Sequence, residues 1–425
     1  MTYYCGPFSF LSSKPTPAQR ILLYGQASGT AHASAGAAVA ERVQRHGLEP
    51  SSEAWDFLSL ALSAVTVDGI HRRNLSADGW TRQLDLSIAA VDPDRWNDVG
   101  GEIARALSFL TTDIWSVSFM PGGQLPRRPR KHAPPKADAV ALLSGGLDSL
   151  IGTIDLASGG SAILGVSQTV RGDSHRQKLF ARRMGQNVQL IQLNHNASTR
   201  RREKETSQRA RSMVFIAFAV LAASTLDKYK SGATIPIYIC ENGFIAINPP
   251  LTLARIGSLS TRTAHPHFLS QIQHIFDKVG LRVKIINPYE EKTKGEMMLE
   301  CRDQDILQEL ATVSTSCGRF QRFNYTHCGR CVPCQIRRAS FLTWDGPDQT
   351  KYHFEDLSIA DSDYAMFDDV QAVKIALETA ESYGLDRWIG NALNSPHIDN
   401  ALALRAMLGR GLQELRTLHE NLRIP

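Results

Sequence analysis

The stretch DAVALLSGGLDSLIGTIDLAS, residues 138 to 158, contains an apolar strand, a glycine-rich turn and a helix in direct succession. Further β-rich apolar segments follow at residues 162 to 168, 187 to 195, 235 to 242 and 282 to 289, with amphipathic or apolar helical segments between them. Strands that alternate with helices in this way are typical of a parallel sheet covered on both faces. We therefore expect an α/β fold with a parallel, doubly wound sheet.

The chain of 425 residues is long enough for two or three structural units. Five prolines and six basic residues without periodicity between residues 121 and 136 indicate an extended linker. The sequence contains no recognisable internal repeat. We expect a small N-terminal α+β domain, the linker, the doubly wound domain and a helical C-terminal region, with bounds 1–120, 121–136, 137–344 and 345–425.

The segment before the linker carries no motif that indicates a chemistry. Its pattern predicts a strand at 84 to 91, a helix at 99 to 112 and a strand at 113 to 120. An alanine-rich segment at 31 to 47 has high helix propensity and is expected to pack against them. Binding of a partner protein is one possible role for this domain.

Composition narrows the class of protein. Hydrophobic residues make up 43% and charged residues 21%, which is ordinary for a globular chain, and the net charge of +5 is too small to require a nucleic-acid partner. The longest apolar stretch, at 214 to 226, is shorter than the roughly 20 residues that span a bilayer, and residues 1 to 15 lack the pattern of a signal peptide. We expect a cytoplasmic protein without a membrane segment.

The glycine-rich turn has the residues of a phosphate-binding loop. Gly145 and Gly146 let the backbone approach a ligand closely, and Ser144 and Ser149 add hydroxyl donors beside the positive end of the following helix. The turn matches neither GxxxxGK[ST] nor GxGxxG. The alternative is a simple glycine-serine turn in which Asp148 caps the helix.

The pattern SGGxDS resembles the loop of the PP-loop ATP pyrophosphatases, which have an adenine nucleotide alpha hydrolase-like fold and cleave ATP between the α- and β-phosphates. A carboxylate in such a loop needs a counter-ion, and we expect Asp148 to act with Mg²⁺. Arg209, Arg211 and Lys294 are candidates for further positive charge around ATP, with surface cations as the alternative.

Four of the seven cysteines lie close together in the sequence: Cys317, Cys328, Cys331 and Cys334. Two overlapping CxxC steps allow a short loop to surround a metal, and four thiolates suit a structural Zn²⁺ site. An iron–sulfur cluster is the second interpretation, His327 is a conceivable replacement for one ligand, and free buried thiols are the third.

The PP-loop is followed by KTKGEM, then SC and CGRCVPCQIR, and this order over residues 138 to 341 resembles the 7-cyano-7-deazaguanine synthases, the QueC-like family. The added flanking regions resemble the QueC-like component of Qat anti-phage operons. The resemblance implies that a 7-carboxy-7-deazaguanine carboxylate is adenylated by ATP and then passed to an amine. It also implies that Ser144, Gly145, Gly146, Asp148 and Ser149 bind the pyrophosphate part of ATP. Asp148, Ser149 and Lys294 would then be catalytic, the four cysteines would bind zinc, and Arg337 would match the arginine after the last cysteine.

The sequence departs from that family after residue 242, where ENGFIAINPPLTLARIGSLSTRTAHPHF replaces the family's substrate segment. Glu241 and Asn242 lie at the carboxyl end of an expected strand and are candidates to bind the guanine-like edge. Arg262, Thr263 and His265 follow in a polar loop where a purine carboxylate or a peptide would dock. The equally weighted alternative is a structured loop with a helix cap at His265 and Pro266.

The departure and the added regions suggest that the acceptor amine belongs to a partner protein from the same operon. The alternatives are an ordinary synthase that uses ammonia, a PP-loop enzyme that modifies tRNA, and a non-catalytic scaffold that senses nucleotide. The basic residues at 199 to 205 favour the tRNA enzyme, but no RNA-binding module is recognisable, so a nucleic-acid partner is not expected.

Overall fold

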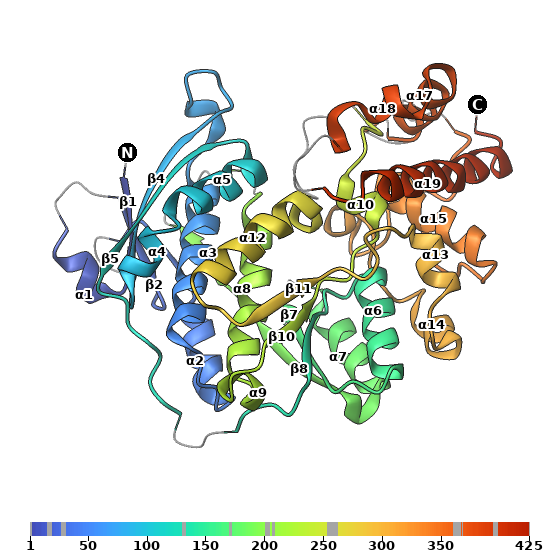
Figure 1. The fold of residues 1–425 in the computed structure, drawn as a ribbon. Coiled ribbons are helices and arrows are strands. Elements are labelled where there is room, and N and C mark those ends of the chain that lie inside the picture. Colours follow the sequence, from blue (N-terminus) through green and yellow to red (C-terminus); the bar gives the residue numbers. More distant parts are fainter. Residues whose placement is uncertain are drawn as a thin grey trace.

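The computed structural model shows two mostly parallel sheets, one on each side of a pair of long helices, with further helices toward the C-terminus (Figure 1). It describes residues 2–14, 19–26, 31–129, 133–169, 172–199, 205, 209–252, 262–359, 367, 369–393 and 398–424. Part of the linker, at 130–132, and most of the basic stretch at 199–205 lie outside these residues.

The glycine-rich turn follows a strand of the second sheet along the chain. Its strands, in spatial order, are β11 (Val283–Ile286), β10 (Ile235–Tyr238), β6 (Ala139–Leu142), β7 (Ile163–Gln168) and β8 (Val188–Leu193). All four neighbouring pairs are parallel. The strand order reverses between β6 and β10, so this sheet is doubly wound, as predicted, and its switch point lies between those two strands.

Helices cover both faces of this sheet. One face packs on α8 (Arg211–Ser224) and α12 (Pro266–Lys278), and the other on α6 (Leu147–Ser158) and α7 (Ser174–Arg183). Alternate residues of β6 face opposite cores: Val140 packs toward α8, whereas Ala141 packs toward α6. This two-sided burial explains why the strand reads as an unbroken apolar run.

The N-terminal sheet corrects the prediction of an α+β domain. In spatial order its strands are β5 (Ile114–Pro121), β4 (Gln83–Ala90), β1 (Thr2–Gly6), β2 (Gln19–Leu23), β3 (Ala33–Ala35) and β9 (Ser198–Thr199). Every pair is parallel except β3 with β9. The unit is therefore α/β, and the predicted helix at 31 to 47 begins with strand β3. Gly36, with φ +79°, ends that strand before α2 (Ala37–Arg45).

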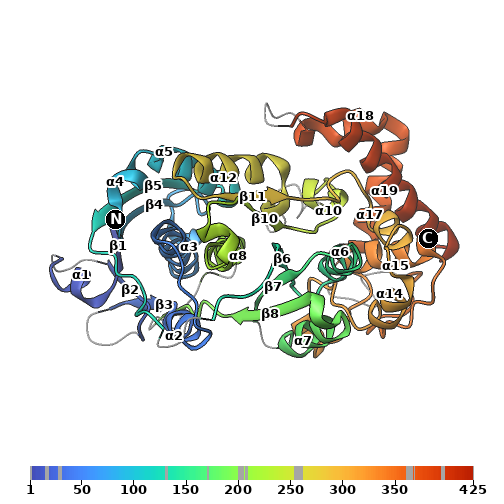
Figure 2. The same ribbon diagram turned by 60° about the horizontal axis from the view of Figure 1, so that its bottom comes forward.

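The two sheets share one topology. If each sheet's own first five strands are numbered along the chain, both have the spatial order 5-4-1-2-3. The helices α3 (Ser52–Ile70) and α8 precede the fourth strand of their sheets, and α5 (Gly100–Thr111) and α12 precede the fifth. Each helix packs against its counterpart, and Figure 2 shows α3 and α8 side by side between the sheets. The structure thus contains a topological repeat that the sequence does not show.

The paired helices explain the longest apolar stretch of the chain. Nearly every residue of α3 and α8 is buried, and both belong to one hydrophobic core that extends from the first sheet to the second. A helix that is apolar on all sides needs cover on all sides. No described helix is long and apolar enough to cross a membrane.

Four further α-helices are short. The helices α1 (Phe8–Ser12) and α4 (Pro93–Asn97) belong to the N-terminal unit, and α9 (Asp227–Lys230) and α10 (Gly243–Ile247) precede and follow β10. The predicted linker begins at Pro121, which ends β5; its other described residues, 122–129 and 133–136, form no helix or strand.

Three helices follow β11 within the predicted second domain: α13 (Lys294–Leu299), α14 (Gln304–Leu310) and α15 (Val332–Trp344). The described residues after 345 form the helices α17 (Asp369–Tyr383), α18 (Leu385–Ile389) and α19 (Ala401–Asn421), as the helical pattern predicted (Figure 1). Together with α10, the helices α15, α17 and α19 enclose a hydrophobic core of their own.

Candidate functional site

The glycine-rich turn lies where the fold predicts a ligand site. It follows β6 directly, and residues 239 to 242 follow β10, so the two segments flank the switch point of the second sheet. A cavity of about 210 Å³ opens here. Its walls include Ser144, Gly146, Asp148, Ser149, Glu241, Lys294, Thr315 and Ser316.

Hydrogen bonds hold the turn in one conformation. The hydroxyls of Ser144 and Ser149 lie 3.0 Å apart, and Ser144 Oγ also accepts from the Gly146 backbone N–H at 3.1 Å. Gly145 has φ +92°, a conformation that only glycine adopts at little cost. Gly146 is the N-cap of α6 and has no side chain to cap the helix, so the first turn presents backbone N–H groups toward the cavity.

Asp148 has protein partners on both carboxylate oxygens. Lys294 Nζ forms a buried ion pair with Oδ1, and Asn242 donates to Oδ2 from its side chain at 2.6 Å and from its backbone at 3.2 Å. Burial opposes ionisation of Asp148, but the Lys294 ammonium and these donors outweigh it and lower the pKa of Asp148. Lys294 thus supplies a counter-charge to Asp148 from within the protein.

Glu241 is the second acid of the cavity. Burial, followed by the charge of Asp148, raises its pKa well above the ordinary value. Asn287, after β11, fixes its backbone by donating to the Glu241 carbonyl at 2.9 Å. The site therefore holds two neighbouring carboxyl groups and one ammonium.

The Asn242 side chain has protein partners on both of its amide atoms. Its amide nitrogen serves Asp148, and its Oδ1 caps α10 by accepting from the Ile245 backbone at 3.0 Å. Because Asn242 is fully buried, its role is to hold Asp148 in place.

Two further cavity residues were not singled out in the sequence. Thr315 donates its backbone N–H to the Gly145 carbonyl at 3.0 Å, and its buried hydroxyl has no hydrogen-bond partner among the residues that the structure describes. Ser316 lies beside it, with its Oγ accepting from Arg337 at 3.2 Å. The SC pair before the cysteine loop was the available signal. Arg337 itself is fully buried and supports this wall by further donation to Ser314 and Thr350.

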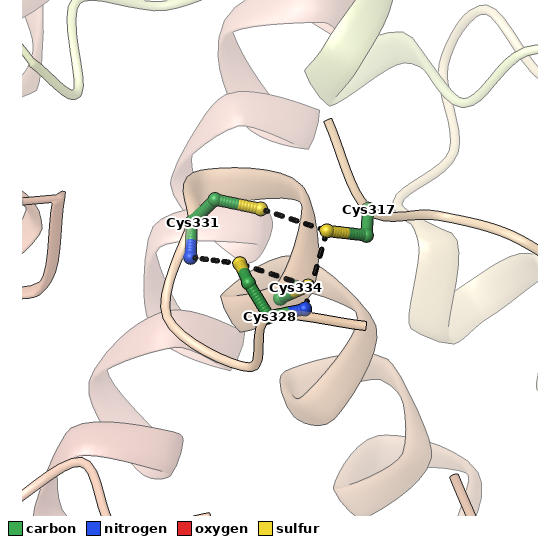
Figure 3. Close-up of side chains that lie close together, drawn as sticks. All are labelled: Cys317, Cys328, Cys331 and Cys334. Atoms are coloured by element: carbon green, nitrogen blue, oxygen red, sulfur yellow. Dashed lines mark hydrogen bonds between the residues drawn. The ribbon is translucent and has the colours of Figure 1, made fainter. Parts of the chain in front are cut away.

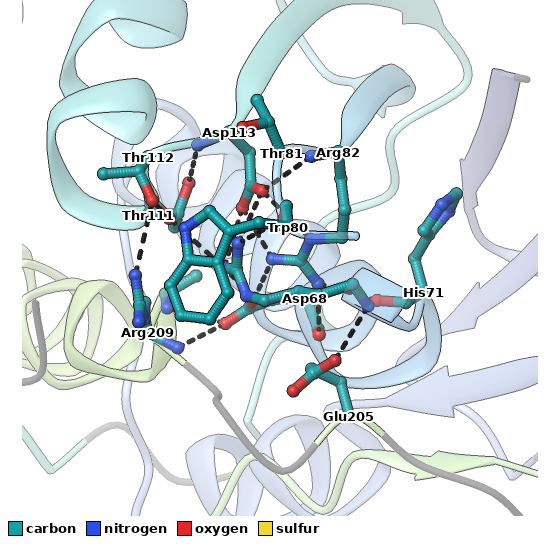
Figure 4. A network of polar contacts seen from close by, with 12 residues as sticks. Asp68, His71, Trp80, Thr81, Arg82, Thr111, Thr112, Asp113, Glu205 and Arg209 are labelled. Carbon is teal, nitrogen blue, oxygen red and sulfur yellow. Dashed lines mark hydrogen bonds and ion pairs between the residues drawn. The ribbon is translucent and has the colours of Figure 1, made fainter. Parts of the chain in front are cut away.

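Arg209 and Arg211 do not line the cavity. Arg209 stacks on the ring of Trp80 at 4.8 Å and donates to Thr112 at 3.3 Å, while its backbone N–H donates to Asp68 at 2.5 Å (Figure 4). Asp68 thereby caps the start of α8. Arg211 lies on the β7 and β8 side of the sheet, where its charge acts on His195 and Asp173.

The network around Arg209 ties the two sheets together (Figure 4). Arg82 is fully buried and donates to Asp68 at 2.5 Å and to Asp113 at 2.6 Å. Arg73 pairs with Asp113 at 2.8 Å. Arg209 therefore belongs to a structural cluster, because a buried carboxylate holds its backbone away from the glycine-rich turn.

Arg262 and His265 also lie outside the cavity. Arg262 donates to the Phe109 carbonyl at 3.0 Å and stacks on the Phe109 ring, with Thr263 next to it in the same 3₁₀ turn. His265 is the N-cap of α12, accepts from the His267 backbone, and precedes Pro266 at the first helical position. Burial, and then Arg262, lower the pKa of His265 to about 4. The helix cap at His265 and Pro266 is thus present, and residues 253–261 of this segment lie outside the described residues.

The four cysteines form a candidate metal centre (Figure 3). Their sulfurs lie within 4.8 Å of one another, all four residues are buried, and two Sγ···Sγ distances are 3.9 Å. A tetrahedron with Zn–S bonds of about 2.3 Å has sulfurs about 3.8 Å apart. The backbone N–H groups of Arg319 and Cys328 both donate to Cys317 Sγ at 3.3 Å, which favours thiolate. This centre could bind a metal such as zinc.

His327 is committed elsewhere. Its Nε2 accepts from the Ser316 backbone N–H at 3.2 Å, and burial, followed by the charges of Arg337 and Arg176, lowers the pKa of His327 to about 3. The neutral ring links the cysteine loop to the cavity wall rather than replacing a thiolate ligand.

Comparison of the sequence with models of known protein families and with curated proteins finds no match.

Proposed function

We propose that the protein is an ATP-dependent ligase of the PP-loop pyrophosphatase type. The observation that carries this proposal is the SGGLDS turn at the switch point of a doubly wound sheet, where a cavity is lined by the start of α6 and by Thr315. The cavity is smaller than the roughly 300 to 1,000 Å³ of most small-molecule sites, so it suits the phosphate part of a nucleotide.

The charges around the turn support a phosphate ligand that is bound together with a cation. Lys294 neutralises Asp148, and Glu241 has a raised pKa, so the cavity without ligand carries little net charge. Carboxylate oxygens are the protein ligands that Mg²⁺ prefers, and Asp148 and Glu241 are adjacent in the cavity. They are the residues that would hold the ion, which would neutralise charge on the phosphates.

The proposed reaction has two steps. A substrate carboxylate oxygen attacks the α-phosphorus of ATP, the bond to the β-phosphate oxygen breaks, and pyrophosphate leaves. An amine then attacks the acyl adenylate, AMP leaves with the bonding electron pair, and the amine loses a proton. The N–H groups of the turn and Ser144 and Ser149 would bind the departing pyrophosphate.

The substrate and acceptor follow from the motif order that resembles the QueC-like family. We propose a 7-carboxy-7-deazaguanine carboxylate as substrate and Glu241, which lines the cavity, as a residue that contacts it. The acceptor is proposed to be an amine of a partner protein, since the chain carries two regions beyond the doubly wound unit. An anti-phage role and a cytoplasmic location belong to the same proposal.

The test is exchange of radiolabelled pyrophosphate into ATP, which reports reversible adenylation without needing the acceptor. We expect exchange that depends on 7-carboxy-7-deazaguanine and is lost in Asp148→Asn. Exchange without the carboxylate would point to another substrate, and no exchange with any carboxylate would contradict the adenylation step.

A further inference from the structure

The C-terminal helix α19 contacts both short helices that hold the partners of Asp148. Met407, Gly411 and Glu414 share one face of α19 because they are spaced four and three residues apart. A methyl group added at Gly411 would overlap the Phe244 ring of α10, and one at Gly243 would come within 2.8 Å of Met407. This face of α19 therefore sets the position of α10, whose N-cap is Asn242.

The same face fixes the first turn of α13, which begins with Lys294. Glu414 accepts a short hydrogen bond from the Thr293 hydroxyl and a further one from the Gly295 backbone N–H. A methyl group added at Gly295 would lie 2.5 Å from Glu414 Oε1 and 2.7 Å from Thr343 of α15. The start of α13 is thus enclosed between α15 and α19.

Glu414 also orients the hydroxyl that caps α13. Thr293 Oγ1 accepts from the Glu296 backbone N–H at 3.1 Å. In turn, the Glu296 carboxylate accepts from the Thr293 backbone N–H at 2.8 Å. Because the hydroxyl hydrogen points to Glu414, a lone pair of Thr293 Oγ1 faces the helix. Arg410 reinforces this arrangement by donating to the Glu291 carbonyl at 2.9 Å and to the Glu296 carboxylate.

We propose that Glu414 is a positioning residue that acts through the first turn of α13 to place the Lys294 ammonium on Asp148. The C-terminal helix thereby completes the site at the glycine-rich turn. This inference rests on the proposed function only where it extends to nucleotide binding. Its structural part concerns the Lys294 and Asp148 pair itself.

Hydrogen exchange of α13 tests the structural part. Glu414→Ala removes both hydrogen bonds, Glu414→Gln keeps an acceptor oxygen, and Glu420→Gln neutralises an exposed acid on the same helix as a control. In the alanine variant we expect the Gly295 and Glu296 amides to exchange about tenfold faster, because each depends on the Glu414 and Thr293 contacts. Rates near wild type are expected in the other two variants. An unchanged rate in Glu414→Ala overturns the proposal.

A double-mutant cycle tests the link to Lys294. The dissociation constant of an ATP analogue with a non-cleavable α,β-bond is measured with Mg²⁺ for wild type, Glu414→Ala, Lys294→Met and the combination. We expect Glu414→Ala to weaken binding about tenfold when Lys294 is present and to add little when it is absent. An equal loss in both backgrounds overturns the positioning role and indicates general destabilisation. If the wild type binds no nucleotide, the proposed function fails, while faster exchange in α13 still supports positioning of Lys294.

Discussion

Replacing Lys294 by methionine leaves the Asp148 carboxylate buried without its counter-charge. Asp148 is 4% exposed and Lys294 is 7% exposed, so solvent cannot take over the role of the ammonium. Removing one partner of a buried ion pair costs about 3–5 kcal/mol of unfolding free energy. The donors from Asn242 remain, so we expect a loss near the lower end, about 3 kcal/mol at neutral pH.

The pH dependence of this loss follows from the two pKa shifts of Asp148. In wild type the folded-state pKa is lowered, so the carboxylate stabilises the fold above its unfolded pKa of about 3.9 and this stabilisation is lost as pH falls. In Lys294→Met the carboxyl group stays buried but loses the ammonium, so burial dominates and raises the pKa of Asp148. The variant is therefore destabilised mainly at neutral pH, and its difference in stability from wild type becomes smaller as the pH falls.

Urea unfolding followed by tryptophan fluorescence, at neutral pH and near pH 4, measures both effects. The matched control is the double variant Asp148→Asn with Lys294→Met, in which no charge is buried. We expect it to recover stability to within about 1 kcal/mol of wild type while remaining inactive toward ATP. A Lys294→Met variant as stable as wild type at neutral pH, or a double variant as unstable as the single one, would refute the assigned ion pair.

Four further substitutions test separate parts of the structure. Arg82→Met removes one of the two buried arginines that pair with Asp113 and the one that donates to Asp68, so it should cost about 3 kcal/mol, measured by urea unfolding; an unchanged midpoint would contradict the network. Thr315→Val removes an unpartnered hydroxyl, so the melting temperature should stay constant while ATP binding weakens by about 1 kcal/mol in calorimetry; unchanged affinity would exclude this hydroxyl as a ligand. Gly145→Ala should lose about 1–3 kcal/mol because of its φ of +92°, and a thermal melt as in wild type would argue against that conformation. Cys334→Ser should lower the metal content, measured by plasma mass spectrometry, and expose the cysteine loop to proteolysis; metal-free wild-type protein would contradict the centre.

Local sequence patterns were sufficient to predict the strand, turn and helix at the switch point of the second sheet. The strand, turn and helix around SGGLDS could be predicted because glycine conformation, apolar burial and helix capping act over a few residues. The four cysteines could likewise be grouped from their spacing, since three of them lie within one loop and the start of α15.

The partners of these groups could not be predicted, because they depend on contacts between distant segments. Arg209 precedes an apolar helix and looked like a phosphate ligand, but Asp68, 141 residues earlier in the chain, fixes its backbone. Asn242 looked like a substrate ligand but holds Asp148, 94 residues away. The short strands β1 to β3 were missed because pairing across the sheet, rather than local preference, makes them strands.

The N-terminal unit was read as a separate domain of another class for the same reason. Its first three strands have at most five residues each, and its strand order becomes visible only when the two sheets are compared. The shared strand order and the pairing of α3 with α8 and of α5 with α12 show that it is packed against the second sheet as a topological counterpart.

The most direct test of the central claim is to identify the products formed from ATP. The protein is incubated with ATP, Mg²⁺ and 7-carboxy-7-deazaguanine, with and without candidate partner proteins, and the nucleotides are separated by chromatography. We predict AMP and pyrophosphate in equal amounts, no product with Asp148→Asn, and a deazaguanine-sized mass gain on a partner protein. Release of ADP and phosphate, or no turnover of ATP with any of these carboxylate and amine combinations, would contradict the proposed adenylation.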